Sequence, residues 1–148
     1  MKRRCFCWTI GSIALLFIIV CMVQGAWAAS ENQSGASANC DIQAGACVQP
    51  LGGGSVTLEI LPRPVKAMTD LTFIVTLQGL APGEGPAIDL EMPGMSMGPN
   101  HVTLERTPDG VYTGRGVIVR CPSGRTLWAA DVTIPGAGIS VFTFNVIY

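Results

Sequence analysis

Histidine is almost absent from this 148-residue sequence, which contains only His101. Acyl transfer by a serine, threonine or cysteine nucleophile usually needs a base beside the nucleophile, so a single imidazole leaves little room for such chemistry. The sequence also lacks the G-x-S-x-G, H-E-x-x-H and phosphate-loop patterns, and its cysteines are not spaced C-x-x-C. These absences predict a protein that is not an enzyme.

Charge is scarce as well, since only 13% of the residues are Asp, Glu, Lys or Arg. Beyond residue 28, six basic and ten acidic residues remain, which gives this part a formal charge of −4. No stripe of lysine and arginine runs along it. Because nucleic-acid-binding domains need such a basic surface, we expect no nucleic-acid partner.

The first 28 residues have the three parts of a secretory signal peptide. A basic start is followed by an apolar run over residues 10–23 and an A-x-A site that ends at Ala28. We therefore predict cleavage after Ala28 and a periplasmic or secreted protein. Two alternatives stay open: an uncleaved inner-membrane anchor over residues 8–27, with the domain outside the cytoplasm, and lipid attachment at Cys21.

No segment beyond the signal peptide has the apolar spacing of a helix. Residues 55–61 and 71–77 instead alternate apolar and polar side chains, which is typical of half-buried strands. Five further segments of this kind follow, over residues 87–92, 102–106, 111–120, 126–134 and 139–147. Turns containing proline and glycine separate them. The pattern predicts an all-β fold, an antiparallel Ig-like β-sandwich of about seven strands over residues 55–148.

Residues 29–54 have a different composition. Small polar residues predict a flexible lead-in, which continues into an irregular arm that contains Cys40 and Cys47 and ends in three glycines. With Cys121, these cysteines predict one disulfide and one odd thiol in an oxidising compartment. All three pairings stay open at this point, although a long-range bridge to Cys121 would suit an arm with so few apolar residues.

The segment E-M-P-G-M-S-M-G-P-N-H, residues 91–101, concentrates sulfur. Methionine often fills gaps in cores, but the surrounding prolines and glycines favour a loop. Outside the cytoplasm, thioether sulfur is a soft donor that selects cuprous copper. The candidate metal ligands are Met92, Met95, Met97 and His101, with the histidine auxiliary. They would converge if Pro93-Gly94 forms a turn, and the acidic residues just before it would attract a cation.

Three motifs in this order resemble those of YtkA-like and FixH-like extracytoplasmic domains. They are M-P-G-M-x-M at 92–97, D-G-V-Y-T-G at 109–114 and G-x-x-x-W-x-A-x-V at 124–132. The resemblance covers residues 55–148 and leaves out the arm. It implies an Ig-like sandwich with a link to copper handling or cytochrome oxidase assembly, and the family's M-P-x-M segment corresponds to Met92, Pro93 and Met95. The M-x-H pairs of better-defined copper carriers are missing here.

These features together predict an exported, non-enzymatic copper-binding or copper-delivery protein. Its partners would be a copper-receiving protein or the membrane machinery of oxidase assembly, and it would contact the membrane itself only if the N-terminal segment stays uncleaved. The alternative is a non-metal interaction module of an extracytoplasmic or membrane complex, in which the methionines form an adhesive surface.

Overall fold

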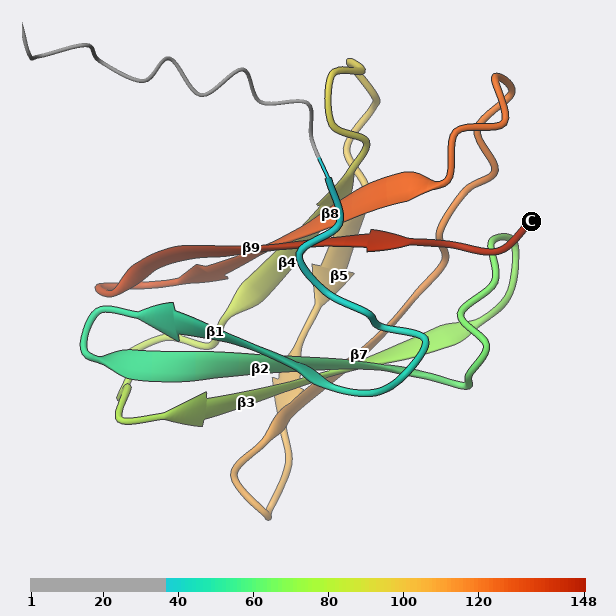
Figure 1. The fold of residues 1–148 in the computed structure, drawn as a ribbon. Coiled ribbons are helices and arrows are strands. Elements are labelled where there is room, and N and C mark those ends of the chain that lie inside the picture. The colour runs from blue at the N-terminus through green and yellow to red at the C-terminus, as the bar shows by residue number, and fades with distance from the viewer. Residues whose placement is uncertain (1–36) are drawn as a thin grey trace, which may run out of the picture. The chain divides into compact units, whose positions relative to one another are not determined.

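The fold is given by a computed structural model, which describes residues 37–148. These residues form nine β-strands and no helix, arranged as two antiparallel sheets (Figure 1). The predicted all-β sandwich is confirmed, with more strands than the seven expected. Nowhere between residues 37 and 148 is there a helix long and apolar enough to cross a membrane. The predicted signal peptide, residues 1–28, lies outside the described residues.

The larger sheet has five strands in the spatial order β1–β2–β3–β7–β6. They are β1 (Cys47–Leu51), β2 (Gly54–Leu61), β3 (Leu71–Gln78), β7 (Tyr112–Gly116) and β6 (Glu105–Arg106). The smaller sheet has four strands in the order β5–β4–β8–β9. They are β5 (His101–Thr103), β4 (Ala87–Glu91), β8 (Leu127–Ile134) and β9 (Gly138–Asn145).

Side chains along the strands alternate between buried and more exposed positions, and the buried ones form the core between the sheets. In β2 every second side chain is buried, and β3 repeats this pattern, as the sequence predicted. The bulkiest fully buried side chains include Phe73 from one sheet and Trp128, Phe142 and Phe144 from the other. Each such side chain contributes roughly 1.5–3 kcal/mol by leaving water, so this layer is what joins the two sheets.

Residues 102–106, predicted as one strand, are divided between the two sheets. The chain forms β5 at an edge of the smaller sheet, crosses at Leu104, and then forms β6 at an edge of the larger sheet. Strands that switch sheets in this way close the side of a sandwich. The prediction of a single strand was wrong because apolar alternation continues through the crossing.

The predicted strand over residues 111–120 is also shorter than expected. Only β7 pairs with its neighbours, and the chain then leaves the sheet. Two hydrogen bonds hold the departing segment: Met68 N–H donates to the Ile118 carbonyl over 2.8 Å, and Asn100 Nδ2 donates to the Val117 carbonyl over 3.2 Å. This segment is therefore fixed by loops on either side rather than by a strand.

The arm, predicted to be irregular up to residue 54, contains the edge strand β1. It pairs with β2 in antiparallel register, and Gly52 and Gly53 form the two-residue turn between them. Their φ angles are 53° and 84°. Positive φ at both central positions is what a type I′ hairpin requires, and glycine adopts it without strain. The glycine run therefore marks a hairpin, and the sandwich begins at Cys47 rather than at Ser55.

The disulfide is the short one of the three pairings left open by the sequence. Cys40 and Cys47 are bonded, with 5.7 Å between their Cα atoms. In residues 37–148, Cys121 is the free cysteine, and it is buried. The long-range bridge that the low apolar content of the arm favoured is therefore not formed.

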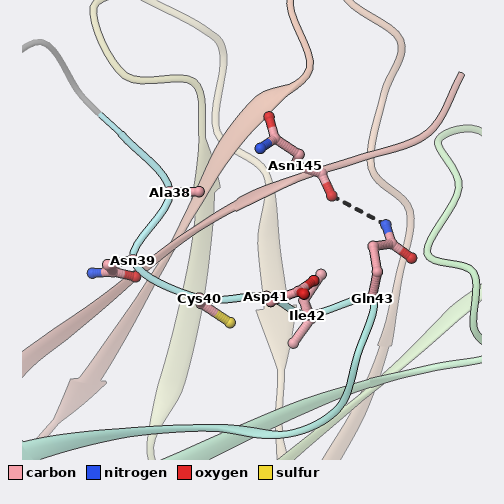
Figure 2. A pocket seen from close by; sticks show the side chains of 7 residues that line it. All are labelled: Ala38, Asn39, Cys40, Asp41, Ile42, Gln43 and Asn145. Carbon is pink, nitrogen blue, oxygen red and sulfur yellow. Dashed lines mark hydrogen bonds between the residues drawn. The ribbon is translucent and has the colours of Figure 1, made fainter.

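Hydrogen bonds attach the arm instead. The Gln43 amide donates to the carbonyls of Val65 and Asn145, each over 3.1 Å, and accepts the Val65 N–H over 2.7 Å. Figure 2 shows Gln43 reaching Asn145 beside a hollow that the arm lines. Asn39 exchanges backbone and side-chain hydrogen bonds with Thr143 of β9. These side-chain amides pair with backbone groups of β9 and of Val65, so hydrogen bonds attach the arm to the sandwich.

Candidate functional site

The methionine segment is a loop that joins β4 to β5 at one end of the smaller sheet (Figure 1). It opens with a turn, in which the Met95 N–H donates to the Met92 carbonyl over 3.0 Å. Pro93 and Gly94 occupy the central positions, and Gly94 has a φ of 75°. Proline followed by a residue with positive φ is the pattern of a type II turn. The turn expected at Pro93-Gly94 is therefore present.

This turn separates two of the candidate ligands rather than bringing them together. The Met92 side chain is 1% exposed and belongs to the buried core, whereas Met95 is 38% exposed. Methionine fills irregular gaps in cores because its side chain is flexible and unbranched. The predicted convergence of all three thioethers is thus not present, since Met92 packs in the interior.

Met95 and Met97 share one surface hollow with two carboxylates. Asp89 and Glu91, at the end of β4, line the hollow together with both methionines. Met97 is partly buried and packs against the core cluster, which limits its mobility. The acidic residues expected on the approach to the sulfur donors therefore lie beside two of them.

A further sulfur atom lies next to Met95. The Cys121 Sγ is 3.9 Å from the Met95 Sδ and 2.9 Å from the Ser123 Oγ. Cys121 is 3% exposed. The hydrogen bond with Ser123 lowers the pKa of the Cys121 thiol, an effect that burial partly opposes. The thiol and the thioether together form a pair of soft donors that comes from two separate loops.

Hydrogen bonds connect the methionine loop to the turn that carries Cys121. The Arg125 guanidinium donates to the Pro93 carbonyl over 2.8 Å. The Tyr148 hydroxyl accepts the Cys121 N–H over 3.3 Å and donates to the Arg125 carbonyl. The buried indole of Trp128 donates to the same hydroxyl over 3.4 Å. The positions of the two sulfur atoms are therefore set by the surrounding structure as well as by their own loops.

His101 lies away from the sulfur pair, at the start of β5. It stands opposite Asp89 in the strand register, and its Nδ1 contacts the Asp89 carboxylate, a contact that is an ion pair only when the imidazole is protonated. Its side chain is 68% exposed. His101 does not line the hollow that holds Met95 and Met97. One of its two nitrogens is thus already engaged by a carboxylate.

The carboxylates themselves form a row across the smaller sheet. Asp131 of β8 stands opposite Asp89 of β4. Burial raises the pKa of the Asp131 carboxyl, and the negative charges of Glu91 and Asp89 raise it further. Burial first, and then the negative charges expected near the sulfur donors, therefore disfavour the charged form of Asp131.

The sequence did not reveal the contact between Cys121 and Met95. Cys121 was expected mainly in a disulfide, and residues 95 and 121 are far apart in the chain. The available signals were the odd cysteine and its position in a C-P-S-G turn. Neither signal says which loop lies against that turn.

Comparisons with known proteins add nothing to this geometry. No family model matches the chain, and no curated protein or solved structure matches it. Between residues 37 and 148, no three His, Cys, Asp or Glu side chains form a group that could hold a metal ion. The pair of Cys121 and Met95, a thiol and a thioether, is a donor set of a different kind.

Proposed function

We propose that this protein is an extracytoplasmic, non-enzymatic copper-binding or copper-delivery protein that holds cuprous ion at the methionine loop. The observation that carries the proposal is the hollow in which Met95 and Met97 lie together beside Asp89 and Glu91. Thioethers are soft donors that favour cuprous ion over harder cations. The carboxylates raise the local concentration of cations without being soft ligands themselves.

Three further features support this proposal. The Cys40–Cys47 disulfide fits an oxidising compartment outside the cytoplasm. Met95 is exposed, so an arriving ion can reach its sulfur without unfolding the loop. The resemblance of the M-P-x-M segment to YtkA-like and FixH-like domains points to copper handling too. A copper-receiving protein or the machinery of oxidase assembly remains the proposed partner.

The second candidate is an interaction module that binds no metal. Val117 and Val119 are 37% and 40% exposed, on the segment that Asn100 of the methionine loop holds by a hydrogen bond. With Met95, these side chains would offer apolar area to another protein. This candidate predicts that replacing thioethers by leucine leaves function intact, because leucine preserves apolar area and volume.

A competition titration separates the two candidates. The purified protein, as processed by the expressing cell, is titrated anaerobically with cuprous ion against a chromophoric cuprous chelator. We expect one bound ion, and at least about tenfold weaker binding for the double variant Met95→Leu/Met97→Leu, since each lost ligand costs on the order of 1 kcal/mol or more.

The matched control is Met68→Leu, which removes a thioether that is 66% exposed and lies outside the hollow. It should bind copper as the wild type does. The copper proposal is wrong if the wild type binds no cuprous ion, or if the double variant binds as tightly as the wild type.

A further inference from the structure

We propose that Cys121 is the principal ligand of this copper site, and that its thiolate and the Met95 thioether hold one cuprous ion between them. This inference rests on the proposed copper function, but it assigns the strongest donor to a residue outside the methionine loop. It also explains why a free cysteine lies against an exposed methionine rather than among apolar side chains alone.

The separation of the two sulfur atoms fits a shared metal. Metal–sulfur bonds are about 2.3 Å long, so two sulfurs that share a trigonal or tetrahedral ion with at least one further ligand lie roughly 3.8–4.0 Å apart. The distance from Cys121 Sγ to Met95 Sδ is 3.9 Å. An ion can therefore be accommodated by side-chain adjustment, without displacement of either loop.

Cys121 belongs to the buried core cluster, but its sulfur also has a polar neighbour. A packing cysteine acts as a small apolar side chain. Here the Ser123 hydroxyl lies 2.9 Å from the Sγ, where it can donate to a thiolate. Arg125 follows in the same turn, and its guanidinium is fixed on the Pro93 carbonyl. The Ser123 hydroxyl can therefore remain as a donor to the sulfur when a metal ion takes the place of the thiol proton.

The two sulfur donors differ in solvent exposure, and this difference sets the order in which an ion reaches them. Met95 is 38% exposed, whereas Cys121 is 3% exposed. An arriving ion meets the thioether first and reaches the thiol behind it. The binding step then replaces the S–H bond of Cys121 by an S–Cu bond and releases the proton to solvent. Copper stays cuprous throughout, so no oxidant or reductant takes part.

The fixed positions of the loops favour binding. The hydrogen bond from Arg125 to Pro93 joins the loops directly, and Tyr148 holds the backbone at Cys121. Ligands that are already placed lose little conformational freedom when the ion arrives. The pair is therefore a preorganised site rather than two sulfurs that meet by chance.

The test is carried out with the full chain in a background where the cysteines of the first 28 residues, Cys5, Cys7 and Cys21, are serine. Cuprous competition is measured for this background, for Cys121→Ser and for Met95→Leu/Met97→Leu. We expect Cys121→Ser to weaken binding by at least about 100-fold, since even the loss of a residue that only supports a ligand costs 10–100-fold. The near-ultraviolet thiolate-to-copper absorption should disappear with it.

A second measurement needs no variant at Cys121. One equivalent of cuprous ion should slow modification of Cys121 by a small thiol reagent at least tenfold, as followed by mass spectrometry of the peptide that contains it. If Cys121→Ser does not fold, this modification rate still tests whether Cys121 binds the ion. Unchanged modification rates and no thiolate absorption in the copper-loaded protein would overturn the assignment.

The outcomes also distinguish the two proposals. If Cys121→Ser binds copper as the background protein does while the methionine double variant does not, the copper function stands and Cys121 is not a ligand. If the background protein binds no cuprous ion, both proposals fail. Loss of binding in both variants, with protection of the thiol, supports both.

Discussion

At the scale of single residues, Met92 and Met95 show how one turn gives the same amino acid two roles. The type II turn at Pro93-Gly94 directs one thioether into the core and leaves the other at the surface, next to Cys121. Methionine suits both places, because the same flexible side chain that fills a gap in a core also carries a soft donor.

The difference in burial between Met92 and Met95 can be measured by truncating each side chain to alanine. Met92→Ala should lower the free energy of unfolding by about 2–5 kcal/mol, because it leaves a cavity in the core. Met95→Ala, at a partly exposed position, should lower it by less than about 1 kcal/mol. Urea unfolding without metal, followed by tryptophan fluorescence, gives both values. Similar losses for the two variants would contradict the burial described for Met92.

At the scale of elements, the row of carboxylates across β4 and β8 destabilises the smaller sheet. Like charges directly opposite each other on neighbouring strands repel, and Asp89 and Asp131 stand in that relation. Burial and this repulsion raise the pKa of the Asp131 carboxyl. His101 contacts Asp89 from the other side and offsets part of the charge when it is protonated.

The direction of the pKa shift predicts how stability depends on pH. At a pH below the pKa of about 3.9 that an aspartate has in the unfolded chain, Asp131 carries its proton in both the folded and the unfolded state. As pH rises through the raised folded pKa, the native state must release a proton that it binds more tightly than the unfolded chain does, so stability falls. Asp131→Asn should therefore raise the free energy of unfolding near pH 7 by about 0.2–1 kcal/mol and leave it unchanged at low pH.

Urea unfolding at several pH values measures this effect. The matched control is Asp70→Asn, which removes an exposed carboxylate outside the row. It should not reproduce the pH-dependent gain. A gain for Asp131→Asn that persists at low pH would show that its cause is something other than the charge.

The segment that leads from β5 into the crossing at Leu104 lies so close to β7 that it leaves no room for a side chain at Gly114. A Cβ at Gly114 would collide with the Thr103 carbonyl oxygen and come within 2.9 Å of a Val102 methyl. Gly114→Ala should therefore destabilise the protein by about 1–3 kcal/mol through overpacking. Gly45→Ala is the control, because a Cβ there meets nothing within 4 Å. Equal stability of the two variants in thermal unfolding would refute the close approach.

At the scale of the whole molecule, the sequence predicted the architecture better than the site. Alternation is a local property, so β2 and β3 could be recognised with their buried faces correctly assigned. The hairpin at Gly52-Gly53 was missed, because three glycines also mark a flexible linker and only the register with β2 distinguishes the two. Local chemistry thus predicts strands, and pairing decides where the sandwich begins.

The candidate site depends on contacts between distant parts of the chain. The sequence identified Met92, Met95 and Met97 as candidate thioether ligands in a loop and predicted the turn at Pro93-Gly94. It did not predict that Met92 would fill the core, because burial there depends on which strands pack below the loop. Nor did it place Cys121 beside Met95, since nothing in either segment specifies the other.

Residues 37–148 contain one disulfide and one buried free thiol, and this combination has a consequence for how the chain matures. Cys40 and Cys47 close a short loop, so they meet often in the unfolded chain and can be oxidised early. Cys121 can exchange with them only while the sandwich is open, because a thiolate must reach a disulfide sulfur to attack it. Which cysteines pair therefore depends on the relative rates of oxidation and folding. The folded domain preserves the Cys40–Cys47 disulfide because it encloses the third sulfur.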